Sequence, residues 1–291
     1  MTASADPRSL LAPLGQAIAE GRLIPFLGPD LLETGEAECP VPTSTRGLVE
    51  RLTARVGVPG RIRGNLWASA QYIETYRHRT TLVKLMTEIF KQTPPVGPLQ
   101  RWLAGLPGLP LIVDSWYDAT LSEAFKDRND WGQVQAASRH GLAEVVFLRA
   151  ISAAGVEVPL DAAAAWKTLI YKPHGAIWPL ADMLVSDSDY VEALTEIDIQ
   201  TPIPVAVQEI RATRGFLFLG CRFHDQMLRI YARQILKRSA GPHYALLPED
   251  LTRNELRFLD ELSITPLFLD LETAIPLLTG GDGGGLSLIH I

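Results

Sequence analysis

Polar residues follow four apolar segments of this 291-residue chain, and they include the side chains best suited to bind or transform a ligand. These polar segments are GPDLL (Gly28–Leu32), DSWYD (Asp114–Asp118), PHGAIW (Pro173–Trp178) and CRFHD (Cys221–Asp225). His174 stands directly after an apolar run and before a glycine, and histidine is the side chain that titrates near neutral pH. Together these segments predict a polar ligand site with one candidate acid–base group.

Each segment also has a simpler interpretation when it is taken alone. Gly28 follows an apolar run, where a glycine often only permits a tight turn. Asp118 and Asp225 stand where helices are expected to begin, and aspartate is a common helix cap. His174 fits a loop histidine with satisfied hydrogen bonds equally well. The ligand site therefore depends on the four segments lying together.

The apolar segments that precede these turns read as buried strands. They are GRLIPFLG (residues 21–28), LPLIVDS (109–115), TLIYK (168–172) and GFLFLGC (215–221). Strands of this kind, bounded by Gly or Pro and alternating with helices, predict a mostly parallel, Rossmann-like α/β sheet covered by helices on both faces. Ligands bind at the carboxyl ends of such strands, so we expect the four turns to surround one cleft.

The rest of the chain fits the same fold class. Further strands are expected at 144–149, 243–248 and 264–270, and a helical excursion at about 43–106. We expect residues 1–280 to form a single α/β domain.

Composition excludes several classes of protein. The formal charge is −6 and no block of Lys and Arg occurs, so direct nucleic-acid binding is not expected. The apolar runs are shorter than the roughly 20 residues that span a membrane, and no signal peptide is visible, which together predict a cytoplasmic protein. Cys39 and Cys221 are too few for a disulfide framework or a four-cysteine zinc site, so we expect no zinc or other metal.

The C-terminal residues form a separate segment. LSLIHI (286–291) is the in-frame translation of a DNA adapter used in transposase-based sequencing libraries, so we expect an artefact there and assign no role to His290. The glycine-rich residues before it have the composition of a flexible linker. We therefore expect 281–291 to be linker and scar, and the native C-terminus to be truncated.

In their order, the turns resemble the motifs of the sirtuin superfamily, in particular bacterial sirtuin-like domains of phage-defence NAD hydrolases such as Thoeris and the partners of prokaryotic Argonautes. FLGPDLL takes the place of the family's Gly-x-Gly-x-Ser loop, and DSWYDATLSEAF that of Thr-Thr-Asn-Tyr-Asp. IYKPHGAI matches Lys-x-His-Gly, VSDSDYVEAL resembles Thr-x-x-Asp-Tyr, and FLGCRFHDQMLR resembles Gly-x-Ser-Phe-x-Asp. The resemblance extends from about Leu23 to the last strand.

The resemblance implies NAD or an ADP-ribose-type nucleotide as ligand, with His174 as the base that activates the attacking nucleophile. It also implies, as further expectations, a homo-oligomer or an associated defence protein. The residues that it places around the nucleotide are Gly28, Asp30, Trp116, Tyr117, Asp118, Gly220, Arg222 and Asp225.

Three of these residues depart from the family pattern. Asp30 replaces the second glycine, which adds a Cβ atom and a negative charge beside the expected pyrophosphate. Trp116 replaces the asparagine that orients ribose and water, and an indole only donates a hydrogen bond. Arg222 replaces a serine and brings a positive charge. Trp116 also fits a residue that simply packs in the core.

Two functions remain open. The first is a nucleotide-binding module with impaired catalysis, acting as a sensor or scaffold in bacterial defence or stress response. The second is an active NAD glycohydrolase that releases nicotinamide with His174 as base. Protein deacylation is not expected, because two cysteines cannot build the zinc module of classical sirtuins.

Overall fold

The computed structural model describes residues 6–34, 38–138, 147–192, 203–224 and 226–280. Asp225, the residues from 281 onward and the first half of the strand expected at 144–149 lie outside the described residues.

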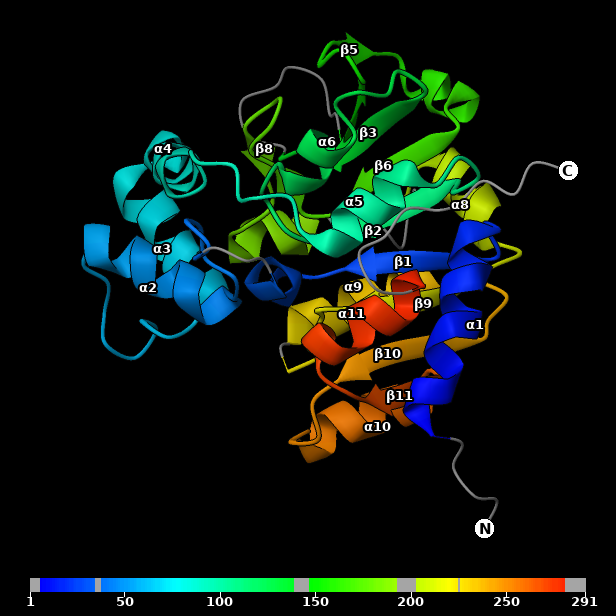
Figure 1. Ribbon diagram of the computed structural model, residues 1–291. Coiled ribbons are helices and arrows are strands. Elements are labelled where there is room, and N and C mark those ends of the chain that lie inside the picture. The colour runs from blue at the N-terminus through cyan, green and yellow to red at the C-terminus, as the bar shows by residue number, and fades with distance from the viewer. Residues whose placement is uncertain (1–5, 35–37, 139–146, 193–202, 225, 281–291) are drawn as a thin grey trace, which may run out of the picture.

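A nine-stranded sheet forms the centre of the described structure, and seven adjacent strands of it are parallel (Figure 1). The short strands at one edge, β4 and β5, are antiparallel. Across the sheet the strands are β11 (Ile264–Phe268), β10 (His243–Leu247), β9 (Gly215–Leu219), β1 (Leu23–Leu27), β2 (Leu111–Asp114), β6 (Thr168–Lys172), β3 (Trp131–Ala136), β4 (Leu148–Ser152) and β5 (Glu157–Val158). The predicted fold class is confirmed, with β1 and β2 as interior strands.

Helices cover both faces of the sheet. Successive side chains of each strand point to opposite faces, and in the central strands both sets are apolar and need to be covered. In β9, Leu217 and Leu219 pack in one core cluster and Phe216 and Phe218 in another. The leucine face is covered by α1 (Pro7–Ala19), α5 (Pro98–Gly105), α6 (Thr120–Ala124) and α11 (Leu271–Thr279). The phenylalanine face is covered by α8 (Val205–Arg211), α9 (Gln226–Leu236) and α10 (Arg253–Glu261).

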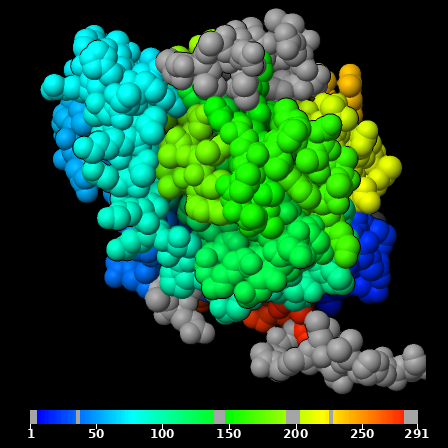
Figure 2. Space-filling model, turned by 90° about the horizontal axis from the view of Figure 1, so that it is seen from above, coloured from blue at the N-terminus to red at the C-terminus, as the bar shows by residue number. Residues whose placement is uncertain are grey.

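Three helices of the predicted excursion form a bundle beside the sheet rather than over it. They are α2 (Thr45–Arg55), α3 (Leu66–Arg77) and α4 (Arg79–Ile89), which project as a lobe at one side of the molecule (Figure 2). The Arg79 guanidinium ties the bundle to the rest of the protein, since it pairs with Asp189 at 2.6 Å and donates to the Met183 carbonyl at 2.5 Å.

Short elements complete the described chain. They are the 3₁₀ helices η1 (Pro29–Thr34) and η2 (Leu160–Ala165), the paired strands β7 (Gly175–Ala176) and β8 (Asp182–Met183), and a helix over residues 187–192. None of the helices in the described ranges is long and apolar enough to cross a membrane.

Candidate functional site

The carboxyl ends of β1, β2, β6 and β9 meet at one pocket, which we call the strand-end pocket. It lies where the strand order reverses, because the chain passes from β1 to β2 on one side and later returns to β9 on the other. The pocket has a volume of about 50 Å³. Its lining includes Asp30, Ser44, Thr45, Ser115, Trp116, His174, Arg222, His224 and Tyr231. Four residues that the sequence singled out, from four separate turns, therefore share one pocket.

Gly28 and Gly220 lie against each other at the ends of β1 and β9, and neither belongs to the lining of this pocket. The Gly28 amide donates to the Leu219 carbonyl at 2.9 Å, and a Cβ atom at Gly28 would lie 2.1 Å from the Gly220 carbonyl oxygen. Gly220 has a φ of +65°, and its own Cβ would meet the Leu31 amide at 2.7 Å. Both glycines are thus required by the contact between neighbouring strands, with or without a ligand.

The turn after β1 has few amide groups to offer a phosphate. The amides of Gly28, Asp30 and Leu31 donate to the carbonyls of Leu219, Gly220 and Gly28, respectively. Pro29 has no amide hydrogen at all. Phosphate-binding loops point free backbone N–H groups at the ligand. In this turn those N–H groups are already bonded to carbonyls at the end of β9 and in the turn itself.

Asp30 adds a carboxyl group to the same turn. Burial, together with the nearby charge of Glu33, raises its pKa to about 7, although the charge of Arg222 opposes this rise. Near neutral pH this carboxyl is therefore shared between its protonated and ionised forms, which disfavours a pyrophosphate at this point of the pocket.

Trp116 stands at the centre of the turn after β2 and is 3% exposed. Its indole N–H donates to the Pro42 carbonyl at 2.8 Å, and its ring contacts Phe90 and Tyr117. The side chain belongs to the core cluster of the α2–α4 bundle. Trp116 therefore joins the bundle to the end of the sheet, while one side of its ring borders the strand-end pocket.

His174 follows β6 and is 2% exposed. Its Nδ1 lies 2.9 Å from the Tyr190 hydroxyl, and its ring packs against that of Tyr231 at a tilt of 48°, with centroids 4.6 Å apart. Burial, together with the positive charge of Lys172, lowers the pKa of His174 to about 3. The imidazole is neutral at physiological pH, and it is a much weaker base than a group titrating near 7.

Beside this pocket lies a buried ion pair that the sequence motifs contained but that we did not predict. Lys172 Nζ lies 2.6 Å from Asp114 Oδ2 and also donates to the Asp118 carbonyl at 2.9 Å. Burial raises the pKa of Asp114, and Lys172 opposes that rise. The sequence did contain a signal for this pair, because two largely apolar strands, β2 and β6, each end in a charged residue.

The remaining predicted residues have structural partners. Asp118 Oδ1 accepts from the Thr120 amide at 2.9 Å in the turn before α6, whose N-cap is Ala119, and the Tyr117 hydroxyl donates to the Leu184 carbonyl at 2.8 Å. Arg222 borders the pocket, but its guanidinium bonds Glu255 at 3.1 Å and the Asp250 carbonyl at 2.9 Å. Arg222 is therefore directed mainly at α10, not at Asp30.

A protein-family model described as a SIR2-like domain matches residues 110–267, which is more than half of the chain. The chain belongs to the SIR2-like domain family. The matched range runs from the start of β2 into β11, so it contains the turns of Trp116, His174 and Arg222. Gly28 and Asp30 precede it. No curated protein matches the chain.

SIR2-like domains generally bind NAD, so the family is consistent with a function related to this nucleotide. Within the described ranges, no group of three or more His, Cys, Asp and Glu side chains is placed to hold a metal. Both cysteines, Cys39 and Cys221, are free thiols.

Proposed function

We propose that this SIR2-like domain binds NAD or an ADP-ribose-type nucleotide at the strand-end pocket and hydrolyses NAD slowly or not at all. The observation that carries the proposal is the position of Trp116. Where the family has an asparagine that orients ribose and water, this chain has a buried indole committed to the Pro42 carbonyl. We propose a role for the domain as a sensor or scaffold in bacterial defence only from the resemblance of its motifs to those of the phage-defence proteins.

Support for binding comes from the location and chemistry of the pocket. It lies at the switch in strand order, where open α/β sheets bind their ligands. Hydroxyl groups of Ser44, Thr45 and Ser115 and the carboxyl group of Asp30 border it. These groups suit the hydroxyls of a ribose, which both donate and accept hydrogen bonds.

A nucleotide needs more room than the pocket has in this conformation. A volume of about 50 Å³ holds a few water molecules, whereas small-molecule pockets usually measure roughly 300–1,000 Å³. Thr45 Oγ1 and His224 Nε2 approach to 3.4 Å across the pocket, which makes a weak contact between the start of α2 and the segment before α9. We expect a nucleotide to separate these two segments when it binds.

Support for weak catalysis comes from three features of the site. Trp116 offers no acceptor that could orient a water molecule. The amides of the turn after β1 are used internally, so a pyrophosphate lacks its usual donors. A histidine with a pKa of about 3 is a poor general base at neutral pH.

One observation favours the active NAD glycohydrolase as a second candidate. His174 borders the pocket while its Nδ1 contacts the Tyr190 hydroxyl, which fixes the orientation of the ring. A base held by a third group is the usual arrangement for activating a nucleophile.

Calorimetric titration with ADP-ribose and with NAD tests the binding proposal. We expect both nucleotides to bind wild-type protein, and Thr45→Trp to weaken binding roughly tenfold or more because it fills the pocket. Thr80→Trp, at an exposed position on α4, is the matched control and should bind like the wild type. Absence of binding by both nucleotides, or equal binding by Thr45→Trp, would contradict the proposal.

A further inference from the structure

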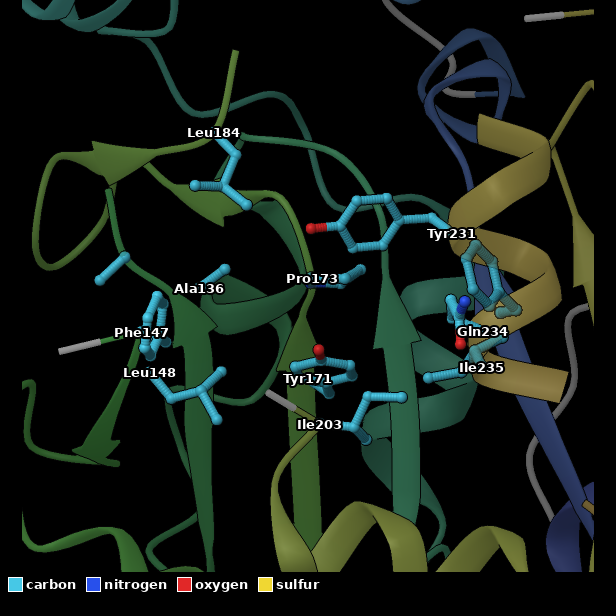
Figure 3. A pocket seen from close by; sticks show the side chains of 12 residues that line it. Ala136, Phe147, Leu148, Tyr171, Pro173, Leu184, Ile203, Tyr231, Gln234 and Ile235 are labelled. Atoms are coloured by element: carbon cyan, nitrogen blue, oxygen red, sulfur yellow. The ribbon is translucent and has the colours of Figure 1, made fainter. Parts of the chain in front are cut away.

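A second pocket lies on the phenylalanine face of the sheet, between the β3–β4 edge and α9, and we call it the inner pocket (Figure 3). Phe147 and Leu148 lie on one side of it and Gln234 and Ile235 on the other, with Tyr171 and Pro173 of the β6 segment between them. The inner pocket is partly open to solvent, and its enclosed volume is about 30 Å³. Most of the lining is apolar, so its few polar atoms decide what it can bind.

Two of these polar atoms are phenol oxygens. Tyr171 is 3% exposed and Tyr231 is 9% exposed, both side chains line the pocket, and neither hydroxyl is among the fully enclosed atoms without a partner in the described residues. Figure 3 shows Tyr231 reaching from α9 across the pocket, above Tyr171. Burial raises the pKa of both phenols, so each remains a protonated donor. Each hydroxyl can therefore donate to water in the pocket or to an acceptor group of a ligand that displaces this water.

A buried positive charge lies near the same two elements. Arg211 is 3% exposed, and its Nη1 donates to the carbonyls of Gln234 at 2.8 Å and Ile235 at 2.9 Å, near the end of α9. Among the described residues no carboxylate pairs with it, and its Nε lacks a partner. The charge of Arg211 acts on Tyr171, where it opposes the rise in the pKa. An anion in the inner pocket would therefore be stabilised.

We propose that the inner pocket binds a short-chain carboxylate, whose carboxylate group accepts hydrogen bonds from Tyr171 and Tyr231 in the field of Arg211. The enclosed volume of about 30 Å³ takes a group of two or three atoms, about the size of a carboxylate. The carbon chain then lies against the apolar side chains of Phe147 and Leu148. Hydrogen bonds from neutral donors to a charged acceptor are stronger than those between neutral groups, which favours an acid over an alcohol.

The inner pocket is separate from the strand-end pocket. The two share Phe26 and Tyr231 in their linings, whereas Tyr171, Phe147 and Leu148 belong to the inner pocket alone. The inference does not rest on the nucleotide proposal, because a carboxylate in the inner pocket would contact Tyr171, Phe147 and Leu148, which do not line the strand-end pocket.

Titration with butyrate, followed by nuclear magnetic resonance of the protein methyl groups, tests the inference. We expect butyrate to bind in the millimolar range, with shifts centred on Leu148, Leu184 and Ile235. Butan-1-ol and butylamine have the same chain without the negative charge and should bind roughly tenfold more weakly. Tyr171→Phe and Tyr231→Phe should each weaken butyrate binding roughly tenfold, whereas Tyr76→Phe, at a residue 66% exposed, should leave it unchanged.

Three results would overturn the inference: no binding of butyrate up to ~50 mM, equal binding of butan-1-ol, or equal butyrate binding by both tyrosine variants. Thermal unfolding of each variant shows whether its fold is kept. If a tyrosine variant does not fold, Leu148→Trp replaces it, because the larger side chain of this lining residue fills the pocket. Butyrate should then not bind, and undiminished binding by Leu148→Trp would also overturn the inference.

Discussion

The indole N–H of Trp116 donates a 2.8 Å hydrogen bond to the backbone carbonyl oxygen of Pro42. The two residues are 74 positions apart in the chain, and the bond links the end of β2 to the segment that enters the α2–α4 bundle. The same ring borders the strand-end pocket. One side chain thus links the bundle to the sheet and also borders the candidate ligand pocket.

Replacing Trp116 should therefore reduce stability before it changes any ligand affinity. We expect Trp116→Ala to lower the free energy of unfolding by about 3–5 kcal/mol. Trp116→Phe should cost about 1–2 kcal/mol, since it keeps ring contacts but leaves the Pro42 carbonyl without its donor. Urea unfolding of both variants measures these losses, with Trp102→Phe, at a half-buried position on α5, as control. Wild-type stability in Trp116→Ala would show that the ring does not join the bundle to the sheet.

Gly28 should be required for folding even in the absence of nucleotide. A Cβ atom there would lie 2.1 Å from the Gly220 carbonyl oxygen, so β1 and β9 would have to separate. We expect Gly28→Ala to lower the free energy of unfolding by about 3 kcal/mol or more. Gly64→Ala is the matched control, because nothing lies within 4 Å of its added Cβ. A stable Gly28→Ala protein that has lost only nucleotide binding would instead favour a phosphate-binding role for this glycine.

The buried pair of Lys172 and Asp114 should be more costly to break than to remove. Lys172→Met leaves the Asp114 carboxylate buried without its partner, and we expect a loss of about 3–5 kcal/mol in the free energy of unfolding. Combining Lys172→Met with Asp114→Leu should recover most of that loss, because no uncompensated charge remains. Chemical denaturation of the single and double variants at pH 7 makes the comparison. A double variant no more stable than Lys172→Met would mean that the pair is not the dominant interaction.

Asp30 should make the folded protein less stable as the pH rises, because burial disfavours the ionised form of its carboxyl group. Its pKa is about 7 in the folded protein against an ordinary value of 3.8. Between these values the folded state binds more protons than the unfolded state, so stability falls as the pH rises through this range. Asp30→Asn removes this titration. We expect the difference in the free energy of unfolding between Asp30→Asn and wild type to shift by about 1–2 kcal/mol in favour of the variant from pH 4 to pH 8.

The titration of His174 changes stability with pH in the opposite direction, so the Asp30 experiment must separate the two contributions. With a pKa of about 3 against 6.5, His174 gives stability that is present above pH 6.5 and is lost as the pH falls toward 3. The difference between Asp30→Asn and wild type, measured by urea unfolding at each pH, cancels this background. A difference that stays constant from pH 4 to pH 8 would show that the Asp30 carboxyl titrates normally.

The central strands could be predicted because β1, β2, β6 and β9 are short apolar runs that end in polar turns. β3 was missed, since it carries Gln133 and Gln135, which are buried and bond each other at 2.9 Å. The Gln133 amide also donates to the Trp178 carbonyl at 3.0 Å. Polar residues in an interior strand read as a loop until their distant partners are known.

The helices that follow β10 and β11 were also missed. Thr252 and Glu255 form a capping box at the start of α10, which is a signal that the sequence does contain. The site was predictable only as a set of turns. The partners of Trp116 and Lys172 lie 74 and 58 residues away, and those pairings follow from the fold rather than from local pattern.

Nicotinamide release from NAD is the measurement that tests the central claim most directly. The account predicts that wild-type protein binds ADP-ribose yet releases nicotinamide no faster than His174→Ala, because Trp116 cannot orient the attacking water. Loss of one such positioning group costs roughly 10²-fold or more in rate. Trp116→Asn alone should restore little activity, and adding Asp30→Gly should restore more. Rapid nicotinamide release by the wild type that disappears in His174→Ala would contradict the account and establish an active NAD glycohydrolase.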